Sequence, residues 1–539
     1  MSVPLAGETD VPGAGPPEPD IAGPPSFRLI DRPGSLWRLV FFLALPVLAQ
    51  QALILSVSLS DRFLAGRLEP LPRAQQAEAI GHQVTSFGLL ARSLQPGTGI
   101  ANALAAEIPW EAARQIHSRH ISYQAAQTMA IYVGWTIASL TVLISVGSTA
   151  LVARFVGAGN RRAAIKVANQ SLLLAVALGV TGTAIGLPGL KSFVSLLGLH
   201  GDAGVFAADY MRPLILLLVF QVIESAGIAC FTGAGDTRMG FYVLGGVALL
   251  NLPLAWALFL GWGPFPELRF VGIAVGTAIS HTLGGLAVLL ALALGRAGLQ
   301  LQWKDLWPDW SLLWRMLRIS VPAGIDSLTI IGGHLWFFSI INQLGDAAIG
   351  AHGIGLGWEA TSFLFGLAFG TAAMALVGQN LGAGRPDMAM RSGWVAFALG
   401  ASMMAFMGAV FFAFAPQMFR LFCPLPEQQP IVTVGVPVLR LEAFAEPALA
   451  SLMIFLSALR GAGDTRVPMI FNCIGVLGVR VPLAYLLTRA QLDLGAWGTV
   501  SGWNLGLFGA WLAMLADIYV RGGFFLYRFA SGRWKQVRV

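Results

Sequence analysis

Four acidic residues stand inside long apolar stretches of the C-terminal half. Asp326 and Glu359 each lie near the middle of such a stretch, and Glu442 and Glu446 share a third. A helix places residues four positions apart on one face, so the last two carboxylates are expected to lie together. An ionisable side chain surrounded by hydrocarbon costs about 3 kcal/mol or more. The four acids are therefore predicted to serve a function.

Acids gathered in a medium of low dielectric resist ionising together. One of them can then carry a proton near neutral pH, or several can bind Na+ with carbonyl or hydroxyl oxygens. We expect the acids to converge at similar depth, with no basic residue at that depth in their own three stretches. His334 is the nearest candidate partner of Asp326, and a possible Na+ would be held at Asp326 and Glu446. Competition between this cation and a cationic compound for one site would give antiport. The alternative is that one or two acids only hydrogen-bond a neighbouring helix.

Aromatic and polar residues in the same stretches are candidates for contact with a substrate. Trp336 and Trp358 lie near the acids and have the faces on which an aromatic cation stacks, although such residues also suit packing. Gln221, Glu224 and Asn251 are further candidates in the N-terminal half. Prolines bend helices, and those expected to serve gating are Pro46 and Pro322.

Long apolar segments must position these residues. Hydrophobic residues make up 56% of the 539-residue chain and charged residues only 11%, against about 25% charged in soluble domains. Its mean hydropathy is +0.70. Such a composition excludes a soluble protein and predicts an all-α polytopic membrane protein. Twelve transmembrane helices are expected at 36–68, 126–155, 165–190, 204–232, 239–262, 270–295, 312–343, 347–380, 388–415, 431–459, 467–488 and 493–522.

Two motifs recur in the same order in the two halves of the chain. Residues 150–159 (ALVARFVGAG) match 375–384 (ALVGQNLGAG), and 233–238 (GAGDTR) are identical to 461–466. This repeat predicts a duplication of six spans, giving two six-helix lobes related by a pseudo-two-fold axis along the membrane normal, with the substrate between them. We expect the glycines to end helices in tight turns, the aspartate to cap the next helix and the arginine to reach the headgroups.

Charge sets the expected orientation and boundaries. Lys and Arg total 34 against 27 Asp and Glu. Most of the basic residues precede the first span, lie between alternate spans or follow the last, which predicts cytoplasmic termini. The His and Cys residues form no pattern typical of a metal site or a disulfide framework. The expected regions are a disordered cytoplasmic tail at 1–25, a first lobe at 26–295 with an extracytoplasmic insertion at 69–125 that contains His82, His117 and His120, a linker at 296–311, a second lobe at 312–525 and a basic tail at 526–539.

Several of these segments resemble the multidrug and toxic compound extrusion (MATE) family. They are 61–66 (DRFLAG), 322–326 (PAGID), 377–384 (VGQNLGAG), 460–466 (RGAGDTR) and 480–485 (RVPLAY). The resemblance covers residues 36–525 apart from the insertion. It implies a twelve-span exporter whose lobes enclose a V-shaped cavity. Alternating access driven by Na+ or H+ would export amphipathic organic cations.

The same resemblance implies roles for particular residues. The acids of the seventh and tenth spans occupy the cation-coupling positions of one branch of the family. Asp61 matches an acid of the first span that carries protons in another branch. Here Arg62 replaces the usual Thr, so a structural ion pair is as strongly favoured for Asp61 as proton coupling. Asn251 matches an asparagine of the fifth span, whereas Ala255 stands where that branch has an aspartate. The N-terminal coupling site is therefore expected to be incomplete.

We predict a secondary antiporter of the cell inner membrane, not an enzyme, that acts as a monomer. Its expected partners are small-molecule substrates and lipids, without nucleic acid, and no cofactor is expected besides the coupling ion. One alternative is a flippase for lipid-linked precursors or polysaccharides, which would need cationic residues in the cavity. An intramembrane enzyme and a membrane assembly subunit are less favoured, the former because the spans contain no His-Glu-x-x-His motif or nucleophile pair.

Overall fold

The computed structural model describes residues 29–31, 34–66, 139–196, 201–493 and 499–537. Within them, eleven helices are long and apolar enough to cross a membrane, and a bent helix pair makes up to twelve. The prediction of an all-α polytopic membrane protein is confirmed. The tail at 1–25, the insertion at 69–125 and the first part of the second predicted span, 126–138, lie outside the described residues.

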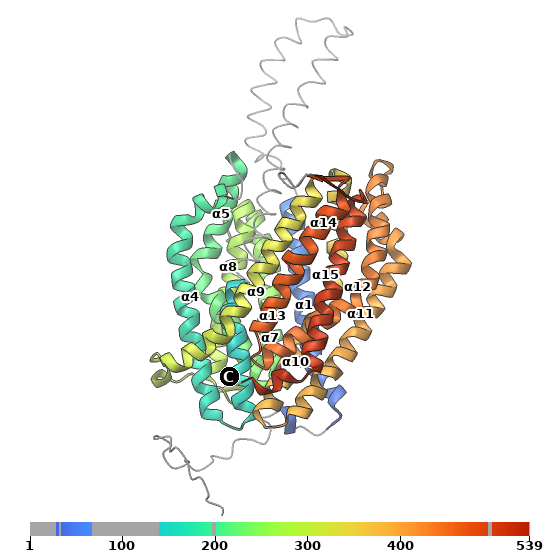
Figure 1. Ribbon diagram of the computed structural model, residues 1–539. Coiled ribbons are helices and arrows are strands. Elements are labelled where there is room, and N and C mark those ends of the chain that lie inside the picture. Colours follow the sequence, from blue (N-terminus) through green and yellow to red (C-terminus); the bar gives the residue numbers. More distant parts are fainter. Residues whose placement is uncertain (1–28, 32–33, 67–138, 197–200, 494–498, 538–539) are drawn as a thin grey trace, which may run out of the picture.

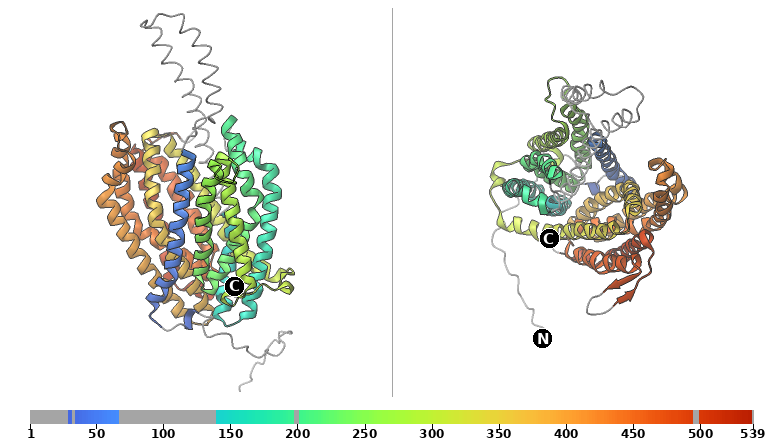
Figure 2. Two further views of the ribbon diagram at one scale, coloured as in Figure 1. Left: turned by 180° about the vertical axis from the view of Figure 1, so that it is seen from behind. Right: turned by 90° about the horizontal axis from the view of Figure 1, so that it is seen from above.

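The N-terminal lobe holds the first half of these helices. Figure 1 shows them from blue to yellow-green, and Figure 2 shows α1 between this lobe and the other. The helices are α1 (Leu36–Gly66), the helical segment Ser139–Gly157, α4 (Arg161–Leu196), α5 (Gly201–Leu216), α6 (Leu218–Ala234), α7 (Thr237–Leu260) and α8 (Arg269–Ala293), accompanied by the 3₁₀ turns η1 (Leu29–Asp31), η2 (Arg296–Gly298) and η3 (Trp303–Leu306).

The C-terminal lobe is drawn from yellow to red in the same figures. It also carries the two-stranded antiparallel hairpin of β1 (Gln491–Asp493) and β2 (Thr499–Ser501). Its helices are α9 (Trp310–Asn342), α10 (Asp346–Gly382), α11 (Pro386–Phe422), η4 (Pro426–Gln428), α12 (Gln429–Gly461), α13 (Arg466–Cys473), the π-helix η5 (Ile474–Arg480), α14 (Val481–Thr488), α15 (Gly506–Ala530) and η7 (Arg533–Gln536).

Three predicted spans differ from the structure. The fourth is broken by a bend of 55° between α5 and α6, where Pro213 removes a backbone donor from the end of α5. The eleventh contains the π-helix η5. The last span was placed at 493–522, but α15 begins only at Gly506 and continues to Ala530, because the preceding residues form the hairpin.

The repeated corner motif ends α6 and α12 as predicted, but its two copies use their aspartates differently. Gly235 and Gly463 adopt φ of 91° and 84°, a left-handed conformation that favours glycine. Asp236 caps α7 by accepting a hydrogen bond from the backbone N–H of Met239. Asp464 makes no such cap for α13. Both aspartates also form an ion pair at 2.8 Å, Asp236 with Arg296 and Asp464 with Arg528.

Helix ends from the two lobes meet at the end of the molecule that carries η1 and η7, which we call the terminal face. The segment Ser139–Gly157 crosses α10 there. A Cβ on Gly157 would lie 2.0 Å from the Gln379 carbonyl oxygen, and a Cβ on Gly382 would lie 2.0 Å from the Arg154 carbonyl oxygen. Both pairs are related by the 225-residue offset of the repeat, so the crossing is pseudo-symmetric. Only glycine permits this approach.

Side chains on both sides of this crossing hydrogen-bond the opposite lobe. Gln379 Nε2 donates to the Gly233 carbonyl oxygen at 2.9 Å. Arg154, its counterpart in the repeat, donates to the carbonyl oxygens of Ala462 and Val537, both at 3.2 Å. These bonds cap the corner turns of the repeated motif, so they join the lobes at the terminal face.

The first helix of each lobe packs partly on the other lobe. The first half of α1, at 40–47, belongs to the hydrophobic core of the C-terminal lobe. The first half of α9, at 312–323, belongs to the core of the N-terminal lobe, where the Gly147 N–H donates to Ser320 Oγ at 2.9 Å. The lobes are thus held together by exchanged helix halves as well as by the glycine crossing.

Candidate functional site

Three glutamates from two helices gather in the C-terminal lobe, and we call them the glutamate trio. Glu359 comes from α10, whereas Glu442 and Glu446 lie one turn apart on α12; their exposed fractions are 7%, 1% and 0%. Their carboxyl groups are close enough for their charges to interact. The sequence prediction that these three acids converge agrees with this geometry.

Each member of the glutamate trio has one buried carboxylate oxygen that has no hydrogen-bond partner among the described residues. These oxygens are Oε2 of Glu359 and Oε1 of both Glu442 and Glu446. The second oxygen of Glu446 accepts a hydrogen bond from Ser362 Oγ. Because a buried polar atom without a partner is costly in free energy, we expect these oxygens to bind a proton or a cation.

Local sequence brings further oxygen atoms to Glu446. Pro447 follows it and has no N–H to donate to the Ala443 carbonyl one turn earlier. Helix α11 comes close at this point, since a Cβ on Gly408 would lie 2.7 Å from the Ala443 oxygen and 3.2 Å from Glu446 Cγ. The proline therefore leaves the Ala443 carbonyl without its helical donor, and the glycine lets α11 pack against the turn of α12 that carries Glu446.

Asp326, the fourth predicted acid, has other partners. It accepts hydrogen bonds from Arg460 at 2.8 Å and from Asn472 Nδ2 at 2.7 Å. An arginine thus neutralises Asp326, and the expectation of Na+ at Asp326 and Glu446 stays a prediction. Within the described residues, no group of three His, Cys, Asp or Glu is arranged to hold a metal ion.

His334 is not the partner of Asp326 either. Its Nδ1 donates to the Ile330 carbonyl at 2.8 Å, one turn back on α9, and its Nε2 lies 3.2 Å from Arg480 Nη1. With Nδ1 protonated, Nε2 can accept from the guanidinium. A histidine placed in this way is neutral and orients Arg480.

Basic residues from other spans reach the depth of the acids. Arg480 and Arg521 are both buried and share Asp517, at 2.8 Å and 2.6 Å. Arg521 also donates to Asn472, which donates to Asp326. Arg480 lies close enough to act on Glu359 and Glu442. The interior of the lobe thus joins the glutamate trio to a network of arginines and aspartates.

Sequence reasoning missed most of this network. In the sequence, Arg480 stood out only as part of a segment that resembles the MATE family, and the predicted span end at 522 left Arg521 at the membrane surface. The available signal was Asp517 and Arg521, four residues apart in an apolar stretch, a spacing at which opposite charges meet on a helix.

The predicted residues of the N-terminal lobe lie on α6, α7 and α1. Glu224 is buried and contacts His281 of α8 at 2.7 Å. Asn251 donates from Nδ2 to Thr277 Oγ1 at 2.9 Å. Gln221 is half-buried. Asp61 is half-buried, and the predicted ion pair with Arg62 falls on a side chain outside the described residues.

The comparison with known protein families assigns the chain. The MatE family model matches residues 122–257 and 322–486, more than half of the sequence. The chain belongs to the MATE family. Its resemblance to that family, first recognised in the corner motifs and in residues 480–485, is confirmed.

Relatives of this MATE-family protein carry transporter names. A probable multidrug resistance protein NorM of Thermotoga maritima is 30% identical over 426 residues, covering 78% of this chain and 88% of the relative. An FAD transporter of Shewanella oneidensis is 26% identical over 264 residues, covering 48% of this chain and 57% of the relative.

Solved structures share the fold of the MATE-family chain. A transporter of the MOP superfamily from Pyrococcus furiosus, described as having a binding pocket of reverse polarity, aligns with a TM-score of 0.76 at 19% identity and covers 93% of this chain and 97% of its own. An outward-facing multidrug resistance MATE transporter aligns with a TM-score of 0.74 at 20% identity, covering 93% and 97%.

The remaining predicted residues have these surroundings. Trp336 is 49% exposed and donates from Nε1 to the Tyr485 hydroxyl at 3.1 Å. Trp358 packs edge-on against Phe422, with ring centroids 5.7 Å apart. Pro46 and Pro322 lie inside α1 and α9, which continue as helices through them. Their assignments to substrate contact and gating stay predictions.

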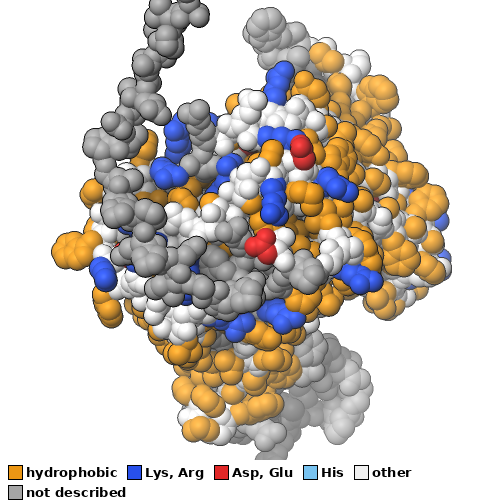
Figure 3. All heavy atoms as spheres, turned by 90° about the horizontal axis from the view of Figure 1, so that it is seen from below, with side chains coloured by type: hydrophobic (Ala, Val, Ile, Leu, Met, Phe, Trp, Pro, Cys, Tyr) orange, Lys and Arg blue, Asp and Glu red, His pale blue; other side chains and the backbone are white. Residues whose placement is uncertain are grey.

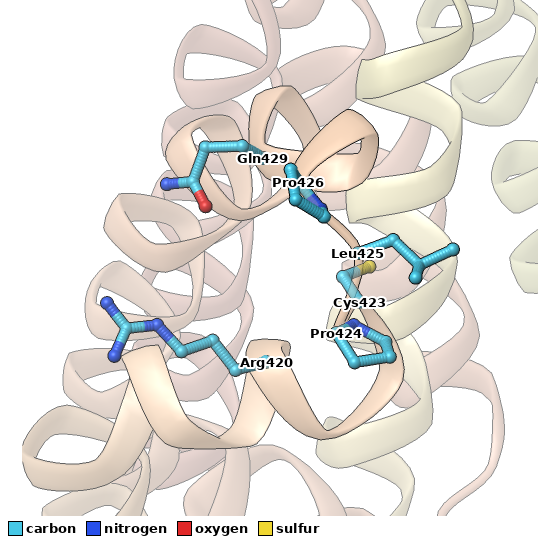
Figure 4. A pocket seen from close by; sticks show the side chains of 6 residues that line it. All are labelled: Arg420, Cys423, Pro424, Leu425, Pro426 and Gln429. Carbon is cyan, nitrogen blue, oxygen red and sulfur yellow. The ribbon is translucent and has the colours of Figure 1, made fainter.

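A pocket at the turn between α11 and α12 does not contain the predicted site (Figure 4). It is lined by Arg420, Cys423, Pro424, Leu425, Pro426 and Gln429. Because it holds a cationic side chain and no carboxylate, it is not the place where an organic cation would bind.

Proposed function

We propose that this MATE-family protein is a cation-coupled multidrug exporter in which members of the glutamate trio bind H+, or one of them binds Na+ together with hydroxyl and carbonyl oxygens, in exchange for an organic cation. The observation that carries the proposal is the set of three buried carboxylate oxygens without partners. The names of the multidrug resistance relatives support export of drug-like compounds.

Charge balance supports the exchange. The interior of the C-terminal lobe holds three arginines and five carboxylates, so full ionisation would leave two uncompensated negative charges. A buried charge without a counter-ion is costly. Bound protons, Na+ or an organic cation can supply the missing positive charge, and occupation by one kind of cation removes the need for the other. The residues of this interior are Arg460, Arg480, Arg521, Asp326, Asp517, Glu359, Glu442 and Glu446.

The arginines also bear on the flippase alternative, which requires cationic groups for an anionic substrate. Arg480 and Arg521 share Asp517, and Arg460 pairs with Asp326. Their charge is already engaged within the lobe, whereas the open oxygens belong to glutamates. We therefore favour a cationic substrate.

The terminal face is proposed to be the cytoplasmic one, with the protein in the inner membrane. Figure 3 shows Lys and Arg side chains in excess over Asp and Glu on this face. Cytoplasmic segments carry such an excess. With the lobes joined at the terminal face, the described conformation would be closed toward the cytoplasm.

The exchange is tested in proteoliposomes loaded with a cationic dye such as ethidium, under a Na+ gradient or a pH gradient applied separately. Glu359→Gln, Glu442→Gln and Glu446→Gln remove one charge each with little change of shape. We expect at least one of the three to reduce gradient-driven transport about tenfold or more, equivalent to about 1.4 kcal/mol.

Glu427→Gln is the matched control, because Glu427 is exposed on η4 of the same lobe. Its transport should equal that of the parent protein. Unchanged, gradient-dependent transport in all three variants of the glutamate trio would refute the proposed coupling site.

A further inference from the structure

The N-terminal lobe contains a buried carboxylate, that of Glu224, which is separate from the glutamate trio. Glu224 of α6 is 2% exposed, and its Oε2 lies 2.7 Å from Nδ1 of His281 on α8. The side chain of His281 is 24% exposed. One end of this pair is therefore sealed in the lobe and the other reaches its surface.

The other oxygen of Glu224 has no partner. Its Oε1 is buried and accepts no hydrogen bond from any described residue. Gly284 leaves room for it, since a Cβ there would lie 2.5 Å from Oε1 and 2.7 Å from Val247 Cγ2. The carboxylate oxygen thus packs against the bare backbone of Gly284, close to a methyl group of Val247.

Two more buried polar atoms without partners lie one helical turn from Gly284 and Val247. Ser280 precedes Gly284 by four residues on α8, and its Oγ makes no hydrogen bond within the described chain. Asn251 follows Val247 by four residues on α7, and its Oδ1 is likewise unpaired among these residues. Positions four apart lie on one helix face. Three helices therefore direct unsatisfied oxygen atoms toward one region of the lobe.

Glu224 is the charged group that interacts with the imidazole of His281. Among the described residues, the charge that acts on this imidazole is that of Glu224. The other charged or titratable side chains on the helices and turns packed around the pair are Arg38 and Asp61 on α1, Arg154 on the segment Ser139–Gly157, Arg161, Arg162, Lys166 and Lys191 on α4, Asp209, Tyr210 and Arg212 on α5, Cys230 on α6, Arg238 and Tyr242 on α7, Arg269 on α8, Arg296 on η2, and Asp346, His352 and Glu359 on α10.

We propose that Glu224 and His281 form a second proton-binding site, which releases a proton from His281 when an organic cation binds between the lobes. With one proton shared, the pair is neutral as a whole. Loss of that proton leaves a carboxylate beside a neutral imidazole, and this single negative charge in low dielectric attracts a cation. The exposed edge of His281 gives the proton its exit.

The inference deepens the proposed function. It rests on that function in one respect, the assumption that a cation is exchanged for the substrate. It adds an ion-binding step in the N-terminal lobe. Because the glutamate trio belongs to the other lobe, variants of the two sites can be told apart.

The test is proton release from purified, weakly buffered protein near pH 7, followed with a pH-indicating dye while ethidium is added. We expect the parent protein to release protons on binding. Glu224→Gln and His281→Asn should each release one proton fewer per bound ethidium. Thr282→Ala, a half-buried neighbour on α8, should release as many as the parent.

Equal release by the parent, Glu224→Gln and His281→Asn would overturn the inference, whatever the glutamate trio does. Equal losses in Thr282→Ala would also overturn it, by showing that any disturbance of α8 has this effect. Glu224→Asp keeps the carboxylate and should restore part of the release. If variants of the glutamate trio release protons normally and the pair variants do not, the inference holds while the coupling site proposed for the C-terminal lobe fails.

Discussion

The glycine crossing at the terminal face makes a quantitative prediction for Gly382→Ala. The new Cβ would lie 2.0 Å from the Arg154 carbonyl oxygen, whereas ordinary contacts begin near 3.4 Å. The helices must therefore separate by about 1.4 Å, and neither backbone atom can move aside as a side chain would. Overpacking of this kind costs about 1–3 kcal/mol, and that range corresponds to about a 5- to 150-fold change in an equilibrium.

The conformation joined at the terminal face should lose population by this factor relative to one open there. Spin labels on cysteines at Asn160 and Arg385, which are exposed and related by the repeat, report the distance between the lobes by pulsed EPR. The three native cysteines are replaced first. We expect Gly382→Ala to shift the distance distribution toward longer values.

Pseudo-symmetry sharpens the test, since Gly157→Ala meets the Gln379 carbonyl at the same 2.0 Å and should act equally. Gly353→Ala is the control, because it lies on α10 with nothing within 4 Å of its new Cβ. If both crossing variants remain folded and keep the parent's distance distribution, the crossing does not hold the lobes together.

Two further changes have defined outcomes. Asp517→Asn leaves two buried arginines without their shared carboxylate, so it should destabilise the protein by about 3–5 kcal/mol. The control is Asp387→Asn, at an ion pair whose carboxylate is 92% exposed, and its stability should lie within about 1 kcal/mol of the parent. Thermal unfolding in detergent compares the two variants. Hydrogen bonds from Lys166 and then Ser311 hold the pKa of Asp309 well below its usual range, so its stabilising contribution is present above about pH 4 and is lost as the pH falls. Asp309→Asn should therefore flatten the acid side of the profile of unfolding temperature against pH, and an unchanged profile would contradict this.

Hydropathy and the repeat were sufficient to predict most of the architecture. Helices α7 and α8 begin within two residues of their predicted starts, because apolar runs bounded by charged or glycine-containing corners give clear ends. The last span failed for a physical reason. The predicted start at 493 took in an apolar stretch before the helix, but Gln491–Asp493 and Thr499–Ser501 pair as a hairpin, and α15 begins only at Gly506.

That single error also hid part of the site. A span ending at 522 places Arg521 at the membrane surface, whereas the observed end at Ala530 places it nine residues, or about 13 Å, inside the helix. The partners of Asp326 were also missed. Arg460, which neutralises it, and Arg521, which is linked to it through Asn472, come from segments that were interpreted as membrane surface. The glutamate trio was predictable, since its members needed only helical spacing and depth.

The exchange of helix halves between the lobes restricts how the protein can alternate its access. If each lobe moved as an intact body, the first half of α1 would leave the core in which it is buried, and so would that of α9. Separation at the terminal face must therefore deform these two helices or transfer their first halves from one core to the other. Pro46 and Pro322 stand where the exchanged segments end, at sites that lack the backbone hydrogen bond that would resist such deformation.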